Sequence, residues 1–448
     1  MRECKTIFLD MARQIHYNKK EWMPRVGRKA KDAMSELLSP AGNMEKLQAA
    51  LRYGADAVYL AGHSFGMRSA ADNFSDEELA AAAAYVHERG KKLYITVNTL
   101  PRGGEYPRLR EYLRLVGEIG ADAVIVSDLG VMATVRELLP NMPIHVSTQA
   151  SISSPAAARA YAALGAERLV LARELQLHEV QAIRAALDPA VSLEAFVHGS
   201  MCVSYSGRCM LSNHFTGRDA NRGACTQPCR WNYTIVEEKR PDEHIPVIEN
   251  ENGTFLLSSR DMCMIRHIPE LLSAGVESFK IEGRMKSAYY TAVITNAYRM
   301  AIDAYEKDPE RYVFDERWYR EVESVSHRAY ATGYWFDDPR ENPQLCTDNG
   351  YIREKAYLAT VSSRGAILDG VETENERGVL CCLKQRNKPV RGTRVELLVP
   401  GKVGIAFTLD ELYDENGLAI EAAPHPLMTF YARLPREASA GDILRAGD

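Results

Sequence analysis

Short apolar runs alternate with longer amphipathic stretches through residues 34–340 of the chain. The runs are rich in Val, Ile, Leu and Ala, which is typical of strands buried on both faces of a parallel sheet. The stretches between most of them have the apolar spacing of helices. Eight runs are predicted as strands, at residues 36–42, 56–62, 92–98, 122–128, 143–149, 168–174, 193–199 and 278–284.

A motif recurs at four of the predicted junctions between a helix and the next strand. Each copy has a glycine, an acid two residues later and then an apolar run. The glycine suits the left-handed residue that ends a helix, so the motif predicts a helix, a stop and a buried strand. The copies are YGADAVYL (53–60), IGADAVIV (119–126), LGAERLVL (164–171) and AGVESFKI (274–281).

Eight strands with crossover helices over about 300 residues predict an α/β fold of the (β/α)₈ barrel type. An open doubly wound sheet stays possible, because a sequence does not show closure. The barrel is expected over 34–340, with a cysteine-rich insertion at 198–260. Residues 1–33 are a basic extension that we expect to be mobile. Residues 350–448 predict a small β-barrel-like domain, because short strand runs alternate there with Gly, Asn and Asp turns.

Polar side chains stand at the ends of the predicted strands. The carboxyl ends of parallel barrel strands carry the functional site, although any one polar residue there also fits the start of an ordinary loop. The set is Ser39, Asn98, Asp128, Gln149, Arg173, Glu174, His198 and Arg284.

Composition narrows the class of protein. The formal net charge of −5 confines any nucleic-acid contact to a local patch. No apolar run is long enough for a membrane span, and no secretory leader is recognisable, so a cytoplasmic protein with reduced thiols is expected. Nine cysteines, an odd number, fit a complete disulfide framework poorly.

Four of those cysteines lie in one loop-like stretch, HGSMCVSYSGRCMLSNHFTGRDANRGACTQPCRW (198–231). The spacing is C-x(6)-C-x(15)-C-x(3)-C, and a fifth cysteine, Cys263, follows after 33 residues. Structural zinc usually takes two close pairs, and only one close pair is present. The spacing therefore favours a metal over disulfides and leaves an iron–sulfur cluster and zinc both open. Buried cysteines without a function are the alternative.

Cations accompany the thiols. Residues 201–230 hold four arginines and a single acid, Asp219, and the run KIEGRMK (280–286) follows the last predicted strand. In a barrel these two segments meet at one mouth, where guanidinium and ammonium groups bind carboxylates or phosphates. The predicted substrate-binding residues are Arg208, Arg218, Arg222, Arg230, Lys280 and Arg284.

Catalytic groups are not identified by the sequence. His198, Glu194 and Glu282 are candidates, because they are ionisable and lie close to the two segments. Four aromatic residues could stack on nucleic-acid bases or equally pack, and packing is the expectation for Trp231; they are Tyr205, Phe215, Trp231 and Tyr233. A metallopeptidase motif, H-E-x-x-H, is absent.

Several motifs resemble the collagenase-like, unassigned-type bacterial peptidase family, and within it the tRNA hydroxylation branch. The resemblance extends over almost all of the chain from residue 34. The matching stretches are LLSPAGNMEKLQAALRYGADAVYLAG (37–62), MRSAADNF (67–74), EAFVHGSMCVSYSGRCMLS (194–212), RDANRGACTQPCRWNY (218–233), KIEGRMKS (280–287) and SHRAYATGYW (326–335).

The resemblance implies an iron–sulfur protein that hydroxylates without oxygen. Relatives are similar in holding a [4Fe–4S] cluster on four cysteines and in acting on the wobble uridine of tRNA, a ribosomal RNA base or a ubiquinone precursor. The tRNA branch implies prephenate, a dicarboxylate, as hydroxyl source and tRNA as partner. Collagenase-like peptidase activity is the alternative that the family label implies, and zinc is the alternative metal. The oligomeric state does not follow.

The resemblance also implies the cluster ligands. They map onto Cys202, Cys209, Cys225 and Cys263, with Cys229 as an alternative member of the close pair.

Overall fold

The structure is a computed structural model of the 448-residue chain. It describes residues 35–67, 72–202, 204–205, 207–231, 234–237, 240–246, 259–336 and 352–447, with backbone alone at 234–246. The predicted basic extension, residues 1–33, lies outside these ranges.

All eight predicted strands form, and they close into a barrel. The order runs from β1 to β7 and then to β11, which pairs in parallel with both β7 and β1. Closure excludes the open doubly wound sheet. The strands are β1 (Glu36–Pro40), β2 (Ala57–Leu60), β3 (Lys92–Val97), β4 (Ala123–Val126), β5 (Ile144–Val146), β6 (Arg168–Val170), β7 (Ser192–Ser200) and β11 (Ser278–Ile281).

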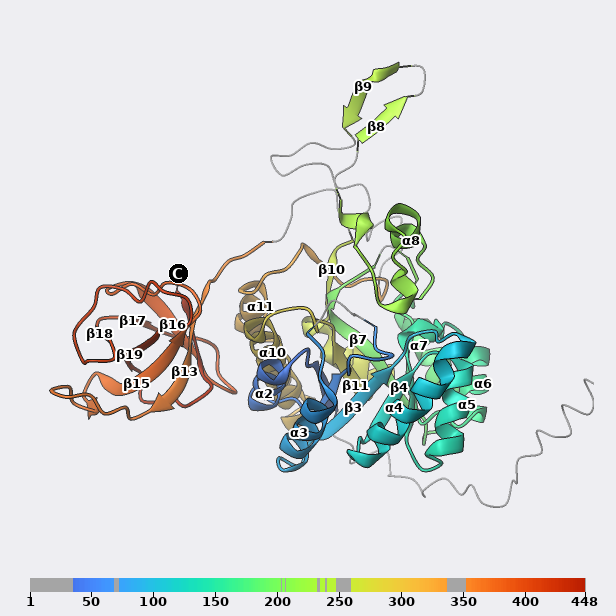
Figure 1. Ribbon diagram of the computed structural model, residues 1–448, viewed down its shortest axis with the longest axis horizontal. Helices are drawn as coiled ribbons and strands as arrows, with labels where there is room; N and C mark the ends of the chain where they lie inside the picture. Colours follow the sequence, from blue (N-terminus) through green and yellow to red (C-terminus); the bar gives the residue numbers. More distant parts are fainter. Residues whose placement is uncertain are drawn as a thin grey trace, which may run out of the picture.

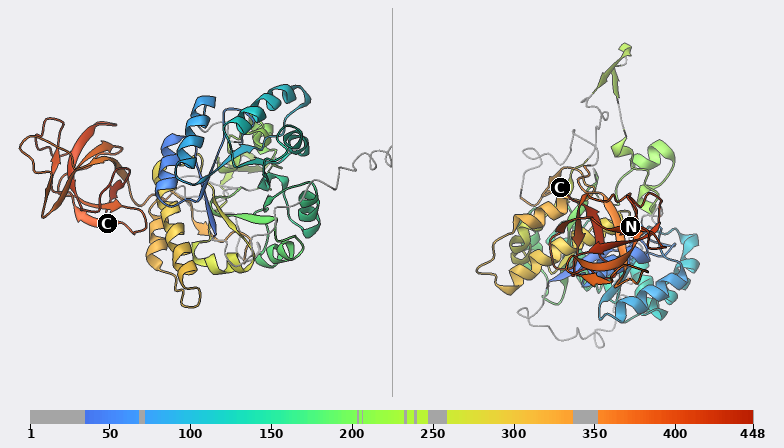
Figure 2. Two further views of the ribbon diagram at one scale, coloured as in Figure 1. Left: turned by 90° about the horizontal axis from the view of Figure 1, so that it is seen from below. Right: turned by 90° about the vertical axis from the view of Figure 1, so that its left-hand side faces the viewer.

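A helix follows each strand in the chain, and these helices surround the barrel (Figure 2). None of the described helices is long and apolar enough to cross a membrane. The helices are α2 (Met44–Arg52), α3 (Asp76–His87), α4 (Tyr106–Glu118), α5 (Leu129–Leu138), α6 (Pro155–Ala163), α7 (Leu177–Ala185), α9 (Ile268–Ser273, after the insertion) and α10 (Ala288–Lys307).

The repeated motif has a physical basis at both of its fixed positions. The glycines at 54, 120, 165 and 275 all have positive φ, which a side chain disfavours. Two residues later, the acid of three of the copies accepts a backbone N–H from the start of a neighbouring strand. Asp56 accepts from Leu37 at 3.0 Å, and Asp122 accepts from Leu93 at 2.8 Å. The motif therefore ends a helix and joins two strands.

The cysteine-rich insertion stands over the barrel mouth (Figure 1). It leaves the end of β7 and returns through β10 (Asp261–Cys263), which pairs antiparallel with β7, a pairing that the sequence did not predict. A two-residue strand, β12 (Tyr330–Ala331), extends this edge. Within the insertion are α8 (Leu211–Thr216), the 3₁₀ turns η3 (Ala220–Arg222) and η4 (Pro228–Arg230), and the hairpin of β8 (Thr234–Glu237) and β9 (Arg240–Pro246).

The C-terminal domain is an antiparallel sheet, as predicted, and lies beside the barrel (Figure 1). Its strand order is β17-β16-β20-β13-β15-β19-β18, with β14 beside β15. The bounds are β13 (Tyr357–Arg364), β14 (Glu374–Asn375), β15 (Gly378–Gln385), β16 (Arg394–Leu398), β17 (Ile405–Thr408), β18 (Leu412–Tyr413), β19 (Thr429–Leu434) and β20 (Ile443–Ala446).

Buried ion pairs fasten the two domains together. Arg445 of β20 lies 2.8 Å from Glu321 of α11 (Glu316–Glu323) and 2.7 Å from Glu396 of its own sheet. Arg52 of α2 pairs with Asp442. Removing one partner of such a buried pair typically costs about 3–5 kcal/mol, so the domain is fixed against α2 and α11.

Candidate active site

A cavity of about 130 Å³ lies at the carboxyl ends of the barrel strands, under the insertion. Four of the polar residues predicted from strand ends line it, namely Asn98, Gln149, Arg173 and Arg284. The others have roles elsewhere. Ser39 contacts Thr295 inside the protein, and Asp128 caps α5.

Four thiols line the same cavity. They are Cys202, Cys209, Cys225 and Cys229, all from the insertion. Burial raises the pKa of the Cys229 thiol, Arg230 lowers it, and the other three cysteines raise it, so each of those three lies within electrostatic reach of Cys229. The seven described cysteines form no disulfide.

Cys263 lies apart from this group. It ends β10, opposite His198 of β7, and its side chain is hydrogen-bonded to Tyr298. Burial raises the pKa of this thiol to about 12. Cys263 does not line the cavity, so the geometry favours Cys229 over Cys263 as the fourth member of the thiol group.

The thiol group suits a soft metal centre by its chemistry. Four sulfur donors from one loop on one cavity wall are the donor set that iron–sulfur clusters and structural zinc take. In the side-chain positions of the described residues, no three His, Cys, Asp or Glu groups are close enough to hold a metal ion. The four cysteines therefore suit a metal centre by residue type and by location in the cavity. Their side chains are not arranged as a set of metal ligands.

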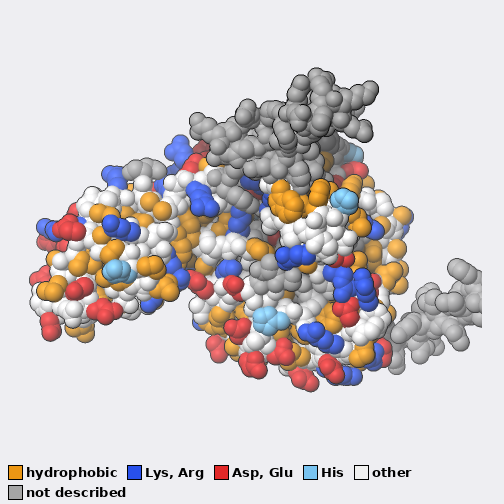
Figure 3. All heavy atoms as spheres, turned by 45° about the horizontal axis from the view of Figure 1, so that its top comes forward, with side chains coloured by type: hydrophobic (Ala, Val, Ile, Leu, Met, Phe, Trp, Pro, Cys, Tyr) orange, Lys and Arg blue, Asp and Glu red, His pale blue; other side chains and the backbone are white. Residues whose placement is uncertain are grey.

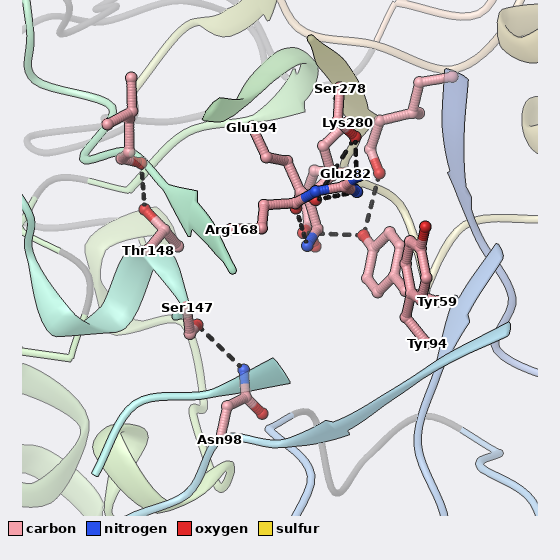
Figure 4. Close-up of polar contacts among 12 residues, drawn as sticks. Tyr59, Tyr94, Asn98, Ser147, Thr148, Arg168, Glu194, Ser278, Lys280 and Glu282 are labelled. Atoms are coloured by element: carbon pink, nitrogen blue, oxygen red, sulfur yellow. Dashed lines mark hydrogen bonds and ion pairs between the residues drawn. The ribbon is translucent and has the colours of Figure 1, made fainter. Parts of the chain in front are cut away.

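Lys280 brings a buried cation to the cavity floor. Its ammonium group lies 2.6 Å from Glu194, a carboxylate with no exposed surface. Arg168 lies 3.3 Å from Glu194 and also pairs with Glu36 at the start of β1. Figure 4 shows this network reaching into the barrel. Burial raises the pKa of Glu36, but Arg168, Tyr94 and Lys92 together lower it by more, so that the pKa lies below its ordinary value.

Two arginines lie beside Lys280 at the cavity. Arg284 is almost fully buried and donates to Thr96 Oγ1 at 3.2 Å. Arg173 donates to the carbonyl of Ser200 at 3.1 Å. Arg173 was predicted as a polar strand end and not as a substrate ligand; its position after β6 was the available signal.

The four arginines of the insertion do not line the cavity. Arg222 forms a surface ion pair with Glu105 at 2.8 Å, and Arg230 donates to Gln227 at 2.6 Å. Arg208 and Arg218 are exposed. Of the six predicted cations, the structure therefore brings only Lys280 and Arg284 to the cavity. Sequence alone does not show which way an arginine in an irregular loop points.

The three catalytic candidates also differ in whether they reach the cavity. Glu282 lines the cavity, and Tyr59 lies 3.5 Å from its carboxylate. Glu194 lies behind Lys280. His198 is buried among tyrosines, with Tyr298 at 3.4 Å from Nδ1, and does not reach the cavity. Glu282 is thus the candidate that can meet a bound molecule.

A serine-hydrolase pattern, G-x-S-x-G, also occurs, as GHSFG at 62–66. A nucleophile elbow needs a strand, a sharp turn and then a helix. Here Ser64 follows β2, but α3 begins only at Asp76, and the Ser64 hydroxyl accepts from Arg108 at 2.6 Å. Ser64 does not line the cavity, so this serine is not built as a nucleophile.

Comparisons with known proteins agree over both domains. Residues 42–344 match the model of peptidase family U32, and residues 356–445 match the peptidase family U32 C-terminal domain. The tRNA hydroxylation protein P1 of Bacillus subtilis is 36% identical over 92% of this chain and 94% of that protein. The tRNA hydroxylation protein P of Escherichia coli is 34% identical over 90% and 94%. A collagenase of Porphyromonas gingivalis is 32% identical over 77% and 84%.

The burial of His198 predicts a pH dependence of folding. Burial lowers its pKa to about 3, against about 6.5 when unfolded. Between these values only the unfolded chain binds the proton, so stability falls as the pH drops. At pH 4.5 this group should cost roughly 2–3 kcal/mol relative to pH 7. Urea unfolding of wild type and His198→Gln, each at both pH values, measures it.

The variant should lose less stability on acidification than the wild type does. Equal losses in both proteins would show that His198 already titrates normally in the folded state.

Proposed function

The chain belongs to peptidase family U32, and from that membership we propose that it hydroxylates carbon 5 of the wobble uridine of tRNA without molecular oxygen, taking the hydroxyl group from prephenate. One observation carries the proposal. The two relatives named for tRNA hydroxylation match it over 92% and 90% of its length.

A [4Fe–4S] cluster is proposed as the resident cofactor. Its ligands would be Cys202, Cys209, Cys225 and Cys229, because these thiols share one cavity wall. When bound, such a cluster supplies one-electron transfer or a Lewis-acidic iron. Zinc on the same thiols is the alternative occupant.

The small co-substrate is proposed to lie against the cations of the cavity. Prephenate carries two carboxylates, and guanidinium and ammonium groups bind carboxylates through charge-assisted hydrogen bonds. Arg173 follows β6, whereas Lys280 lies in β11 and Arg284 in the turn after it, and all three line one cavity. Glu194 holds the Lys280 ammonium in place from behind. Glu282, beside Tyr59, is the carboxylate among the lining residues and is proposed to hold a proton at the bound molecule.

Two other activities remain as candidates. A ribosomal RNA base or a ubiquinone precursor could replace tRNA at the same cavity. Peptide hydrolysis is supported by the relative named collagenase, and it needs a nucleophile beside a base. In the described part of the chain Ser64 meets an arginine and Cys263 is a buried thiol, so the hydrolase is the weaker candidate.

Nucleoside analysis tests the proposal. A strain that lacks this gene should lose 5-hydroxyuridine-type nucleosides from its tRNA, and an intact copy should restore them. Mass spectrometry of digested tRNA and ribosomal RNA measures both substrates together. If only a ribosomal nucleoside were lost, the substrate would be ribosomal RNA instead of tRNA. No change in either RNA, with redundant enzymes deleted, contradicts RNA hydroxylation.

The thiol geometry predicts which cysteines bind the metal. Cys202→Ser, Cys209→Ser, Cys225→Ser and Cys229→Ser should each lower the iron content of anaerobically purified protein severely, because a hydroxyl is a poor ligand for soft metals. Cys263→Ser should keep the iron and the brown colour.

This outcome differs from the ligand set implied by family resemblance, which includes Cys263. Iron that survives in Cys229→Ser and disappears in Cys263→Ser would restore that set. Stoichiometric zinc with no iron, even after reconstitution, would replace the cluster with a structural metal site.

The cavity also predicts a contrast between two arginines. Arg284→Lys keeps the charge but removes the planar guanidinium, and should raise the apparent KM for prephenate about tenfold, the loss of roughly one charge-assisted hydrogen bond. Arg222→Lys, at the surface, should leave KM unchanged. Melting temperatures of both variants check the fold. Equal KM values in the two variants would remove Arg284 from substrate binding.

A further inference from the structure

Two aromatic rings lie exposed together on the insertion. Phe215 of α8 is 49% exposed, Trp231 after η4 is 40% exposed, and their ring centres are 6.1 Å apart. Met210, also exposed, precedes α8. Figure 3 shows hydrophobic side chains at the surface on the face that carries the insertion. Large aromatic side chains are usually buried, so a paired exposure marks a contact surface.

Both rings lie close in the chain to residues that line the cavity. Leu211, the first residue of α8, lines the cavity, and Phe215 is one helical turn further on the same face of the helix. Cys229 lines the cavity too, and Trp231 follows two residues later. A polymer whose one unit enters the cavity would therefore place a neighbouring unit against these rings.

The charge around the rings favours a polyanion. Arg208 and Arg218 are exposed on the same insertion, and Asp219 is the only acid in residues 201–230. Tyr205 is 50% exposed and lines the cavity, so it offers a third ring at the entrance. Exposed aromatics interleaved with arginines are the means by which proteins hold single-stranded nucleic acid.

We propose that Phe215 and Trp231 form a stacking platform for an unpaired base next to the target nucleotide, with Arg208 and Arg218 on the adjacent phosphates. This inference rests on the proposed RNA hydroxylation. It also requires the target base to leave its stack and enter the cavity. The occupant is an unpaired RNA loop, because a duplex keeps its bases stacked on one another and offers no free face to the rings.

Binding of short RNA tests the platform without any turnover. The probe is a fluorescein-labelled octauridine, compared with a duplex of equal length, and anisotropy gives the affinity for wild-type protein. The double variant Phe215→Leu and Trp231→Leu should bind octauridine roughly tenfold more weakly, from the loss of one stacked base. The variant with Phe215→Tyr and Trp231→Tyr should keep wild-type affinity, since it keeps the rings.

The matched control is Phe336→Leu, an equally exposed aromatic (40%) outside the insertion, which contacts His267. Its affinity should not change. Unchanged binding in the Leu double variant, or an equal loss in the control, overturns the platform and leaves the proposed hydroxylation standing. Wild-type protein that binds neither RNA overturns both. A wild-type dimer that the Leu double variant converts to monomers would instead make the rings an interface between copies.

Discussion

The parallel pairing of β11 with β7 is the contact on which the site depends. β11 pairs with β1 on its other side, so this one strand closes the barrel. Closure sets two distant segments side by side at one mouth, the insertion that leaves β7 and the run that follows β11. The thiols come from the first segment, and Lys280, Glu282 and Arg284 come from the second. In an open sheet these groups would lie at different edges.

Closing the barrel buries charge, and the structure compensates for it locally. Glu36, Arg168, Glu194 and Lys280 form a chain of alternating sign through the interior. Burying an isolated charged side chain would raise the free energy of the folded state, and the side chain would tend to become neutral. Each member has a partner of opposite sign, and this pairing offsets the cost of burying Lys280 at the floor of the cavity. The same principle joins the domains, where Arg445 lies between Glu321 and Glu396.

The insertion differs from the barrel in what holds it together. The barrel core is a continuous cluster of buried apolar side chains, whereas the insertion is built from short turns with several exposed apolar side chains. Four thiols that line one cavity would gain a cross-link if they bound a metal, as the proposed cofactor requires. Under the proposed function, the buried cations of the floor would bind the dicarboxylate, and a bound cluster and an RNA would order the wall. Two relatives are named for tRNA hydroxylation and one is named a collagenase, so the name of a relative does not by itself identify the substrate of this chain.

The sequence by itself determined the barrel strands, because their apolar runs and the glycine–acid motif are local patterns with local causes. It also indicated the C-terminal sheet, the thiol loop and the basic run after the last strand. Only the tertiary structure decided closure, the antiparallel strand β10, and which side chains meet. Arg222 and Arg284 look alike in sequence, yet one lies on the surface beside Glu105 and the other at the cavity. In the same way, Cys229 lines the cavity and Cys263 does not. The physical reason is that side-chain direction in an irregular loop is set by contacts with residues far away in the chain, which local pattern does not record.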